Sequence, residues 1–145
     1  MEQPLLPVGC VIMASGLARR FGSNKLLADF GGRPLLCRAL DATNTPQLAA
    51  RIVVTRSAEV EALCKAEGVP CLVHGLPGRN DTVRLGLDAL LAARPDLAGC
   101  MFLPGDQPLL QRETVESMVG IFGWDTKTRI ERQKETEREI FRLAH

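Results

Sequence analysis

Four short apolar segments, rich in β-branched residues, place the strongest limit on how this chain can fold. They span residues 8–14, 51–55, 69–73 and 99–103. Each is a nearly continuous apolar run, which is typical of a strand that is covered on both faces. Stretches with the apolar spacing of helices separate them. This alternation predicts an α/β fold with three layers, in which helices cover both faces of a mostly parallel sheet.

Three helices are predicted between these strands. The first holds the apolar residues of segment 35–40, with Pro34 in its first turn, where proline is well tolerated. The second spans residues 58–67 and ends at Gly68, because glycine commonly follows the last turn of a helix. The third spans residues 81–93.

Composition limits the classes of protein that remain. With 145 residues, of which 46% are hydrophobic, the chain can form one domain with a substantial core. Its 18 basic and 17 acidic residues leave a net charge of +1, so we expect neither a nucleic acid nor an anionic membrane as partner. No apolar run reaches the roughly 18 residues of a membrane span, and Glu2 stands where a secretion signal would carry positive charge. We therefore expect a cytoplasmic protein.

The five cysteines form no C-x-x-C pair, so they predict buried free thiols in a reducing compartment, with a metal-binding or catalytic thiol as the weaker alternative. The C-terminal stretch 126–143, "TKTRIERQKETEREIFRL", is densely charged in both signs. It predicts a solvated helix or a poorly ordered tail.

The stretch "VIMASGLARRFGSNKLL", residues 11–27, follows the first strand into a basic loop. Ligands of open α/β folds bind at the carboxyl ends of the strands, and Gly16 lets backbone N–H groups converge on a phosphate there. Arg20 and Lys25 add positive charge, so the loop predicts a triphosphate site. The alternative is an ordinary turn with solvated basic residues. The spacing matches neither the P-loop nor the dinucleotide fingerprint.

The second chemical motif is "FLPGDQPLL", residues 102–110. Its strand delivers Asp106 to the same sheet edge as the first loop. A carboxylate there suits Mg²⁺, which uses one or two protein carboxylates together with substrate phosphates. The alternative is that Asp106 only caps a turn or the next helix.

Together, "MASGLARRFGSNKLL", "GGRPLL" and "FLPGDQPLL" resemble the MobA-like nucleotidyltransferases that activate the molybdenum cofactor, whose first loop has the form L-A-[AG]-G-x-S-x-R-[MF]-G-x-x-K. The resemblance covers about residues 8–120. It implies a Rossmann-like sandwich, and the transfer of a nucleoside monophosphate to the cofactor's terminal phosphate with release of pyrophosphate. The "MASG" and "GDQP" segments are closer to the cytidylyltransferases of this family, which use CTP. Ala18 stands where the family often has Ser or Gly.

The resemblance also implies which residues act. Arg20 and Lys25 would contact phosphates, and Asp106 would bind Mg²⁺. The expected substrate-binding residues are Ala14, Ser15, Gly16, Leu17, Gly22, Asn80, Thr82 and Gly105. Asp81 or Thr82 could instead be only the N-cap of the third helix. We expect His74 to be a loop residue rather than a ligand.

The resemblance fails after about residue 120, whereas family members usually continue with further strands. We therefore expect a nucleotide-binding domain over 1–120, incomplete at its C-terminus, and a charged tail over 121–145. Three functions stay open: a working cytidylyltransferase, a nucleotide-binding remnant or regulatory module without turnover, and a transferase that uses GTP or acts on sugar or metabolite phosphates. The expected partners are a nucleoside triphosphate, the molybdenum cofactor, and a molybdoenzyme or its chaperone. An uncovered sheet edge would favour a homo-oligomer.

Overall fold

The computed structural model describes residues 6–15, 19–20, 23–76 and 78–122, together with the single positions 135, 138 and 142. Its centre is a parallel sheet of four strands, in the order β7-β6-β1-β8. These strands are β1 (Val8–Ala14), β6 (Ala50–Thr55), β7 (Cys71–Val73) and β8 (Gly99–Pro104). All four were expected from their apolar runs, although β7 begins two residues later than predicted.

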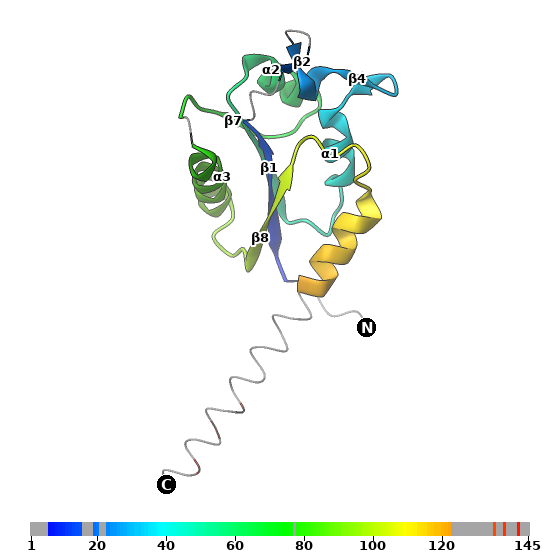
Figure 1. Ribbon diagram of the computed structural model, residues 1–145. Helices are drawn as coiled ribbons and strands as arrows, with labels where there is room; N and C mark the ends of the chain where they lie inside the picture. The colour runs from blue at the N-terminus through cyan, green and yellow to red at the C-terminus, as the bar shows by residue number, and fades with distance from the viewer. Residues whose placement is uncertain are drawn as a thin grey trace.

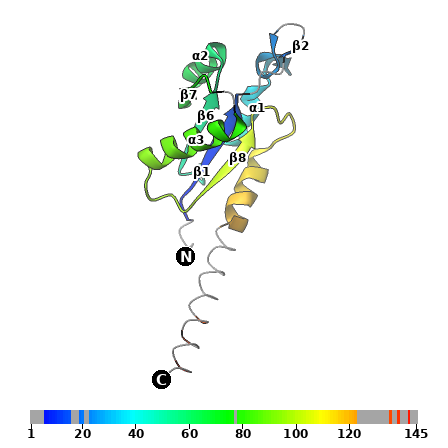
Figure 2. The same cartoon turned by 60° about the vertical axis from the view of Figure 1, so that its left-hand side comes forward.

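Helices cover both faces of this sheet, as Figures 1 and 2 show. On one face lies α3 (Arg79–Ala93), and on the other lie α1 (Leu36–Ala42), α2 (Ala58–Ala66) and a helix that includes residues 112–122. The three-layer α/β architecture is therefore confirmed. The last of these helices was not predicted from the sequence.

The central strand β1 supplies the core on both faces. Cys10 and Ile12 are fully buried on the side of α1 and α2, and Val11 is fully buried on the side of α3. Helix α3 lies very close to the sheet because Gly86 has no side chain. A Cβ at this position would lie 2.6 Å from Cγ1 of Val11. The near-continuous apolar run of β1 thus reflects burial on both faces.

A tight hairpin before α1 corrects one prediction. Strands β4 (Asp29–Phe30) and β5 (Arg33–Pro34) pair antiparallel through Gly31 and Gly32, whose φ angles are +67° and +92°. Two consecutive positive φ angles are typical of the two-residue hairpin turns that favour glycine. Pro34 was expected in the first turn of a helix, which is wrong, because Pro34 lies in β5 and the helix begins at Leu36.

One end of α2 and one end of α3 can be compared with the predicted helix boundaries. Helix α2 ends before Gly68, whose φ of +72° confirms the predicted stop. Helix α3 begins at Arg79, two residues earlier than predicted, with Gly78 as its N-cap residue. Asp81 therefore lies in the first turn, where its Oδ2 accepts a hydrogen bond from Gly78 N at 3.1 Å. The alternative in which Asp81 or Thr82 is the N-cap is wrong.

The remaining elements precede the hairpin. A short antiparallel pair joins β2 (Arg19–Arg20) to β3 (Ser23–Asn24), and the 3-10 turn η1 spans Lys25–Leu27.

Of the predicted charged stretch 126–143, the structure describes only positions 135, 138 and 142, which are helical and exposed. The division into a domain and a tail stays a prediction.

The five cysteines are free thiols, as predicted. Cys10, Cys37 and Cys64 are buried, whereas Cys71 and Cys100 are only half-buried. Burial raises the pKa of the Cys10 thiol to about 12, so this thiol is neutral at ordinary pH. Among the described residues, no helix combines the length and the apolar character that crossing a membrane requires.

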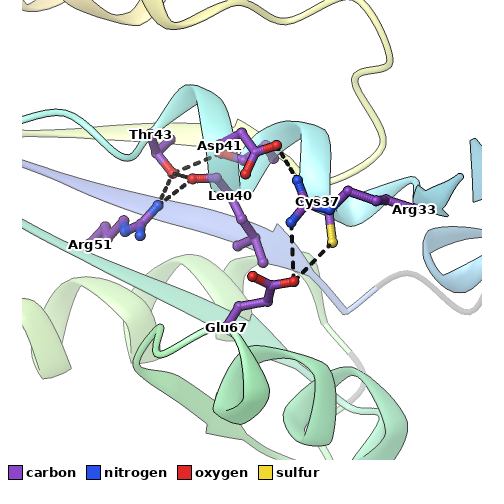
Figure 3. Close-up of polar contacts among 8 residues, drawn as sticks. Arg33, Cys37, Leu40, Asp41, Thr43, Arg51 and Glu67 are labelled. Carbon is purple, nitrogen blue, oxygen red and sulfur yellow. Dashed lines mark hydrogen bonds and ion pairs between the residues drawn. The ribbon is translucent and has the colours of Figure 1, made fainter. Parts of the chain in front are cut away.

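Ion pairs of Arg33 fasten the hairpin to two helices (Figure 3). Its Nη1 lies 2.5 Å from Oδ2 of Asp41 in α1, and its Nη2 lies 3.1 Å from Oε1 of Glu67, which follows α2. The Cys37 thiol donates to the same oxygen of Glu67 at 3.8 Å. We call Arg33, Asp41 and Glu67 the Arg33 cluster.

Arg51 in β6 makes a second connection beside this cluster (Figure 3). Its Nη1 donates to Leu40 O at 2.5 Å and to Thr43 Oγ1 at 2.8 Å, both at the C-terminal end of α1. The guanidinium therefore binds one carbonyl oxygen of the last helical turn and the hydroxyl of Thr43, and it links α1 to the sheet.

Candidate functional site

The carboxyl ends of the four parallel strands lie at one edge of the sheet. Ala14 is in register with Thr55, and Thr55 is in register with Val73, so β1, β6 and β7 end side by side. Strand β8 pairs with the other side of β1, with Pro104 opposite Met13. The loops that follow these strands therefore meet, at the place where open α/β folds bind ligands.

Lys25 and Asp106, 81 positions apart, meet at this edge. Nζ of Lys25 lies 3.5 Å from Oδ2 of Asp106, and the two side chains are 42% and 44% exposed. Lys25 begins the turn η1, which Asn24 caps by accepting a hydrogen bond from Leu26 N at 2.9 Å. The buried side chain of Leu26 anchors this turn to the core. The residue predicted from the sequence to bind phosphate and the residue predicted to bind the metal are thus in contact.

Gly105 sets the position of Asp106. Its N–H donates to Met13 O at 2.9 Å, so the loop after β8 closes onto the end of β1. A Cβ at Gly105 would lie 2.9 Å from Cδ1 of Leu36 and 3.3 Å from Met13 O. Glycine is the residue that permits this close approach. Gly105 is buried, and its predicted contact with substrate stays a prediction.

Ser15, the first residue after β1, is held by three hydrogen bonds. Its Oγ donates to Val54 O at 3.3 Å and lies 3.0 Å from Nε2 of His74. Its carbonyl oxygen accepts from Nε of Arg56 at 2.9 Å. The preceding Ala14 is buried, and its carbonyl accepts from Thr55 Oγ1 at 2.9 Å. The start of the first loop is therefore fixed by the ends of β6 and β7.

His74 was expected to be a loop residue, and it does lie in the loop after β7, but it also joins the site. Its Nε2 lies 3.0 Å from Ser15 Oγ and 3.3 Å from Thr82 Oγ1, and its Nδ1 accepts from Leu76 N at 3.1 Å. We call Ser15, His74 and Thr82 the imidazole cluster. Its signal in the sequence is the position of His74 directly after a predicted parallel strand, at the ligand-binding edge.

The other predicted residues are distributed as follows. Thr82 is buried, with 3% of its surface exposed, and Asn80 is exposed in the first turn of α3. The backbone of Arg20 lies in β2, while its side chain falls outside the part that the structure describes. Gly16, Leu17 and Gly22 also lie outside the described residues. The roles of all these residues in binding or catalysis stay predictions.

Asp106 is a carboxylate at this edge, and its role as a ligand of Mg²⁺ stays a prediction. Among the residues that the structure describes, no group of three or more His, Cys, Asp or Glu gathers around one point. A half-exposed single carboxylate fits Mg²⁺, which commonly takes its other ligands from water and substrate phosphates.

Comparisons with known proteins point to one family. Residues 10–136 match the MobA-like NTP transferase domain. The chain is 33% identical over 118 residues to the molybdenum cofactor guanylyltransferase of Rhodopseudomonas palustris, covering 79% of this chain and 54% of that protein. It is 30% identical over 103 residues to the 3-deoxy-manno-octulosonate cytidylyltransferase of Polynucleobacter asymbioticus, covering 68% of this chain and 41% of that protein.

Solved structures agree on the fold. The crystal structure of Rv0371c from Mycobacterium tuberculosis superimposes with a TM-score of 0.66 at 19% identity, over 83% of this chain and 63% of that one. The chain spans about half the length of the curated relatives that it matches. These likenesses confirm the predicted Rossmann-like nucleotidyltransferase fold.

Proposed function

Because the chain belongs to the MobA-like NTP transferase family, we propose that it is a Mg²⁺-dependent nucleotidyltransferase that transfers CMP from CTP to the phosphate of the molybdenum cofactor. The observation that carries this proposal is the contact between Lys25 and Asp106 at the sheet edge. A cation and an anion so placed can divide the two tasks of the reaction, which are binding phosphates and binding the metal that accompanies them.

The ion pair between Lys25 and Asp106 is weak enough for each residue to bind a ligand instead. At 3.5 Å and with both side chains more than two-fifths exposed, the pair is held weakly, as is usual for surface ion pairs. A triphosphate offers the Lys25 ammonium a stronger anionic partner than one carboxylate. Asp106 can then serve as the protein ligand of Mg²⁺. When bound, Mg²⁺ supplies charge neutralisation to the phosphate oxygens.

The proposed reaction needs positioning more than a general base. A phosphate oxygen of the acceptor attacks the α-phosphorus of CTP, a new phosphorus–oxygen bond forms, and the bond to the bridging oxygen of pyrophosphate breaks. The acceptor phosphate is already an anion at neutral pH, so no proton has to be removed from it. Lys25, with Arg20 as the second predicted phosphate ligand, would stabilise the negative charge that builds on pyrophosphate.

The choice of CTP and of the acceptor rests on sequence likeness. The segments "MASG" and "GDQP" favour CTP, and the relative from Rhodopseudomonas palustris supports a molybdenum cofactor as acceptor, although its name specifies guanylyl transfer. The relative from Polynucleobacter asymbioticus favours a second candidate, cytidylyl transfer to a sugar acid. We propose a soluble cytoplasmic enzyme that self-associates through β8, the outer strand of the described sheet.

Pyrophosphate release tests the proposal. The full chain is incubated with Mg²⁺, the molybdenum cofactor and CTP, GTP or ATP in turn, and then with 3-deoxy-manno-octulosonate in place of the cofactor. We expect release with CTP and the molybdenum cofactor, and we expect Asp106→Asn to lower kcat/KM about 100-fold or more. Asp88→Asn removes an exposed carboxylate from α3 and serves as the matched control, with unchanged activity.

Other outcomes separate the alternatives. Calorimetric binding of CTP without pyrophosphate release would identify a nucleotide-binding module. Release with the sugar acid alone would move the assignment to the second acceptor. If no nucleotide binds in the presence of Mg²⁺, the proposed function is wrong.

A further inference from the structure

The imidazole cluster joins three elements at the sheet edge and contains Ser15 and Thr82, two of the predicted substrate-binding residues. Ser15 follows β1, His74 follows β7, and Thr82 belongs to the first turns of α3. Ser15 and His74 are half-buried, whereas Thr82 is almost fully buried. Ser15 is therefore the hydroxyl of this cluster that can face a ligand, and Thr82 supports the imidazole from inside the protein.

The hydrogen-bond partners of His74 assign its proton. The backbone N–H of Leu76 can only donate, so Nδ1 of His74, 3.1 Å away, must be the acceptor. In a neutral imidazole the proton is then on Nε2. Nε2 lies closer to Ser15 Oγ, at 3.0 Å, than to Thr82 Oγ1, at 3.3 Å. His74 therefore donates a hydrogen bond to Ser15.

This assignment fixes the hydroxyl of Ser15 in turn. A serine hydroxyl has one hydrogen to donate and two lone pairs that accept. Val54 O can only accept, so the hydrogen of Ser15 points to it, and one lone pair is occupied by the N–H of His74. The hydrogen bond from Arg56 to the carbonyl of Ser15 holds the backbone in place. What remains for a ligand is a single lone pair.

We propose that His74 is a positioning residue that makes Ser15 Oγ a hydrogen-bond acceptor for the nucleobase, so that the site selects a pyrimidine with an exocyclic amino group over one with a carbonyl. This proposal rests on the proposed function and on the prediction that Ser15 binds the substrate. Cytosine presents an amino group at the position where uracil presents a carbonyl oxygen. The amino group donates to the free lone pair of Ser15, whereas the carbonyl places one acceptor against another.

The experiment measures Kd for CTP and for UTP by calorimetry, with Mg²⁺, on the full chain and on variants of the cluster. We expect the wild type to bind CTP about tenfold more tightly than UTP, or better, as the loss of one buried hydrogen bond requires. His74→Glu replaces the donor by a group that only accepts, and Ser15→Ala removes the oxygen. Both should bring the two Kd values to within about twofold of each other.

His74→Gln is the matched control, because its side-chain amide keeps an N–H that can reach Ser15, so the preference for CTP should persist. Thermal unfolding checks that each variant folds. If His74→Glu does not fold, Ser15→Ala and His74→Gln still decide the question, because the first should lose the preference and the second should keep it.

Three results would overturn the inference. The first is equal binding of CTP and UTP by the wild type, and the second is an unchanged CTP preference in Ser15→Ala or His74→Glu. The third is an equal loss of affinity for both nucleotides, which would mean that His74 only maintains the fold. In each case the wild type still binds CTP, so the proposed function survives. Binding of no nucleotide by the wild type would overturn both.

Discussion

The Lys25–Asp106 pair and the Arg33 cluster are both built from opposite charges, yet they are bonded very differently. Arg33 contacts two carboxylates from two helical segments, at 2.5 Å and 3.1 Å. Lys25 contacts one carboxylate at 3.5 Å. The guanidinium of Arg33 forms a fork of directed bonds, whereas the ammonium of Lys25 acts as a point charge on a flexible stem.

The difference separates a structural use of charge from a use in ligand binding. In the Arg33 cluster the charges satisfy one another, and the pKa of Arg33 is raised by its hydrogen bond to Glu67 and by the charge of Asp41. An ammonium has three donors and a carboxylate has two oxygens, so the contact of Lys25 with Asp106 uses only part of what the two groups can bind. Substitutions in the two places should therefore affect different measurements.

Lys25→Gln should give the largest effect, and it should fall on activity. We expect kcat/KM for pyrophosphate release to drop about 100-fold, since an ammonium that stabilises the leaving group is lost. The free energy of unfolding should stay within about 0.5 kcal/mol of the wild type, as for most surface substitutions. Steady-state kinetics and urea denaturation make these measurements. Arg33→Gln removes one positive charge outside the site and should leave kcat/KM unchanged. A drop in kcat/KM as large as that of Lys25→Gln would contradict the division into structural and ligand-binding charges.

Arg51→Met should give the opposite pattern, with a smaller effect. The substitution keeps much of the side-chain volume but leaves Leu40 O without its donor from β6. We expect a loss of about 1–2 kcal/mol in the free energy of unfolding, because Leu40 O and Thr43 Oγ1 lose a charged donor, although Leu40 O keeps the 3.3 Å hydrogen bond from Thr43 Oγ1. The Kd for CTP should not change. Urea denaturation and calorimetry check both values, and a weakened Kd in a fully folded variant would contradict the assignment of Arg51 to the structural set.

Added salt should give the smallest effect, and it should distinguish the charge that binds a ligand from the charge that supports the fold. Screening at higher ionic strength weakens exposed charge pairs, so raising NaCl from about 0.05 M to 0.5 M should weaken CTP binding several-fold. The same change should leave the unfolding midpoint nearly constant, because the exposed pairs of Arg33 contribute little to stability and the buried core contributes most of it. Titrations at matched Mg²⁺ concentration measure this. A CTP affinity that does not respond to salt would argue against a site built on Lys25.

The sequence predicts the framework of the site better than its details. The apolar runs predict the four strands, and a parallel sheet brings the residues after its strands to one edge. The contact between Lys25 and Asp106 could therefore be predicted from the sequence. The family match extends to residue 136, beyond residue 120, where the motif resemblance stops. The confirmed parts are those that depend on periodicity and on strand ends.

The details that were missed depend on contacts between distant segments. Besides Leu76, His74 contacts Ser15 and Thr82, which belong to other elements and come close to it only in the folded protein. The position of Pro34 depended on whether Gly31 and Gly32 would adopt positive φ, and local propensity alone allowed either a hairpin or a helix start there. The helix that includes residues 112–122 is different, because its apolar residues Val115, Met118, Val119 and Phe122 have helical spacing and pack on the core, so its periodicity could have predicted it.

The order of the strands has a consequence for how the chain acquires its structure. The central strand β1 is made first, but one of its two neighbours, β8, lies about ninety positions later, with Val8 opposite Gly99. On the ribosome, one side of β1 must stay unpaired until residue 104 has emerged. Pairings so far apart in sequence form slowly and leave apolar strand edges exposed in the meantime. Nascent chains of this protein should therefore depend on chaperones until β8 has been synthesised.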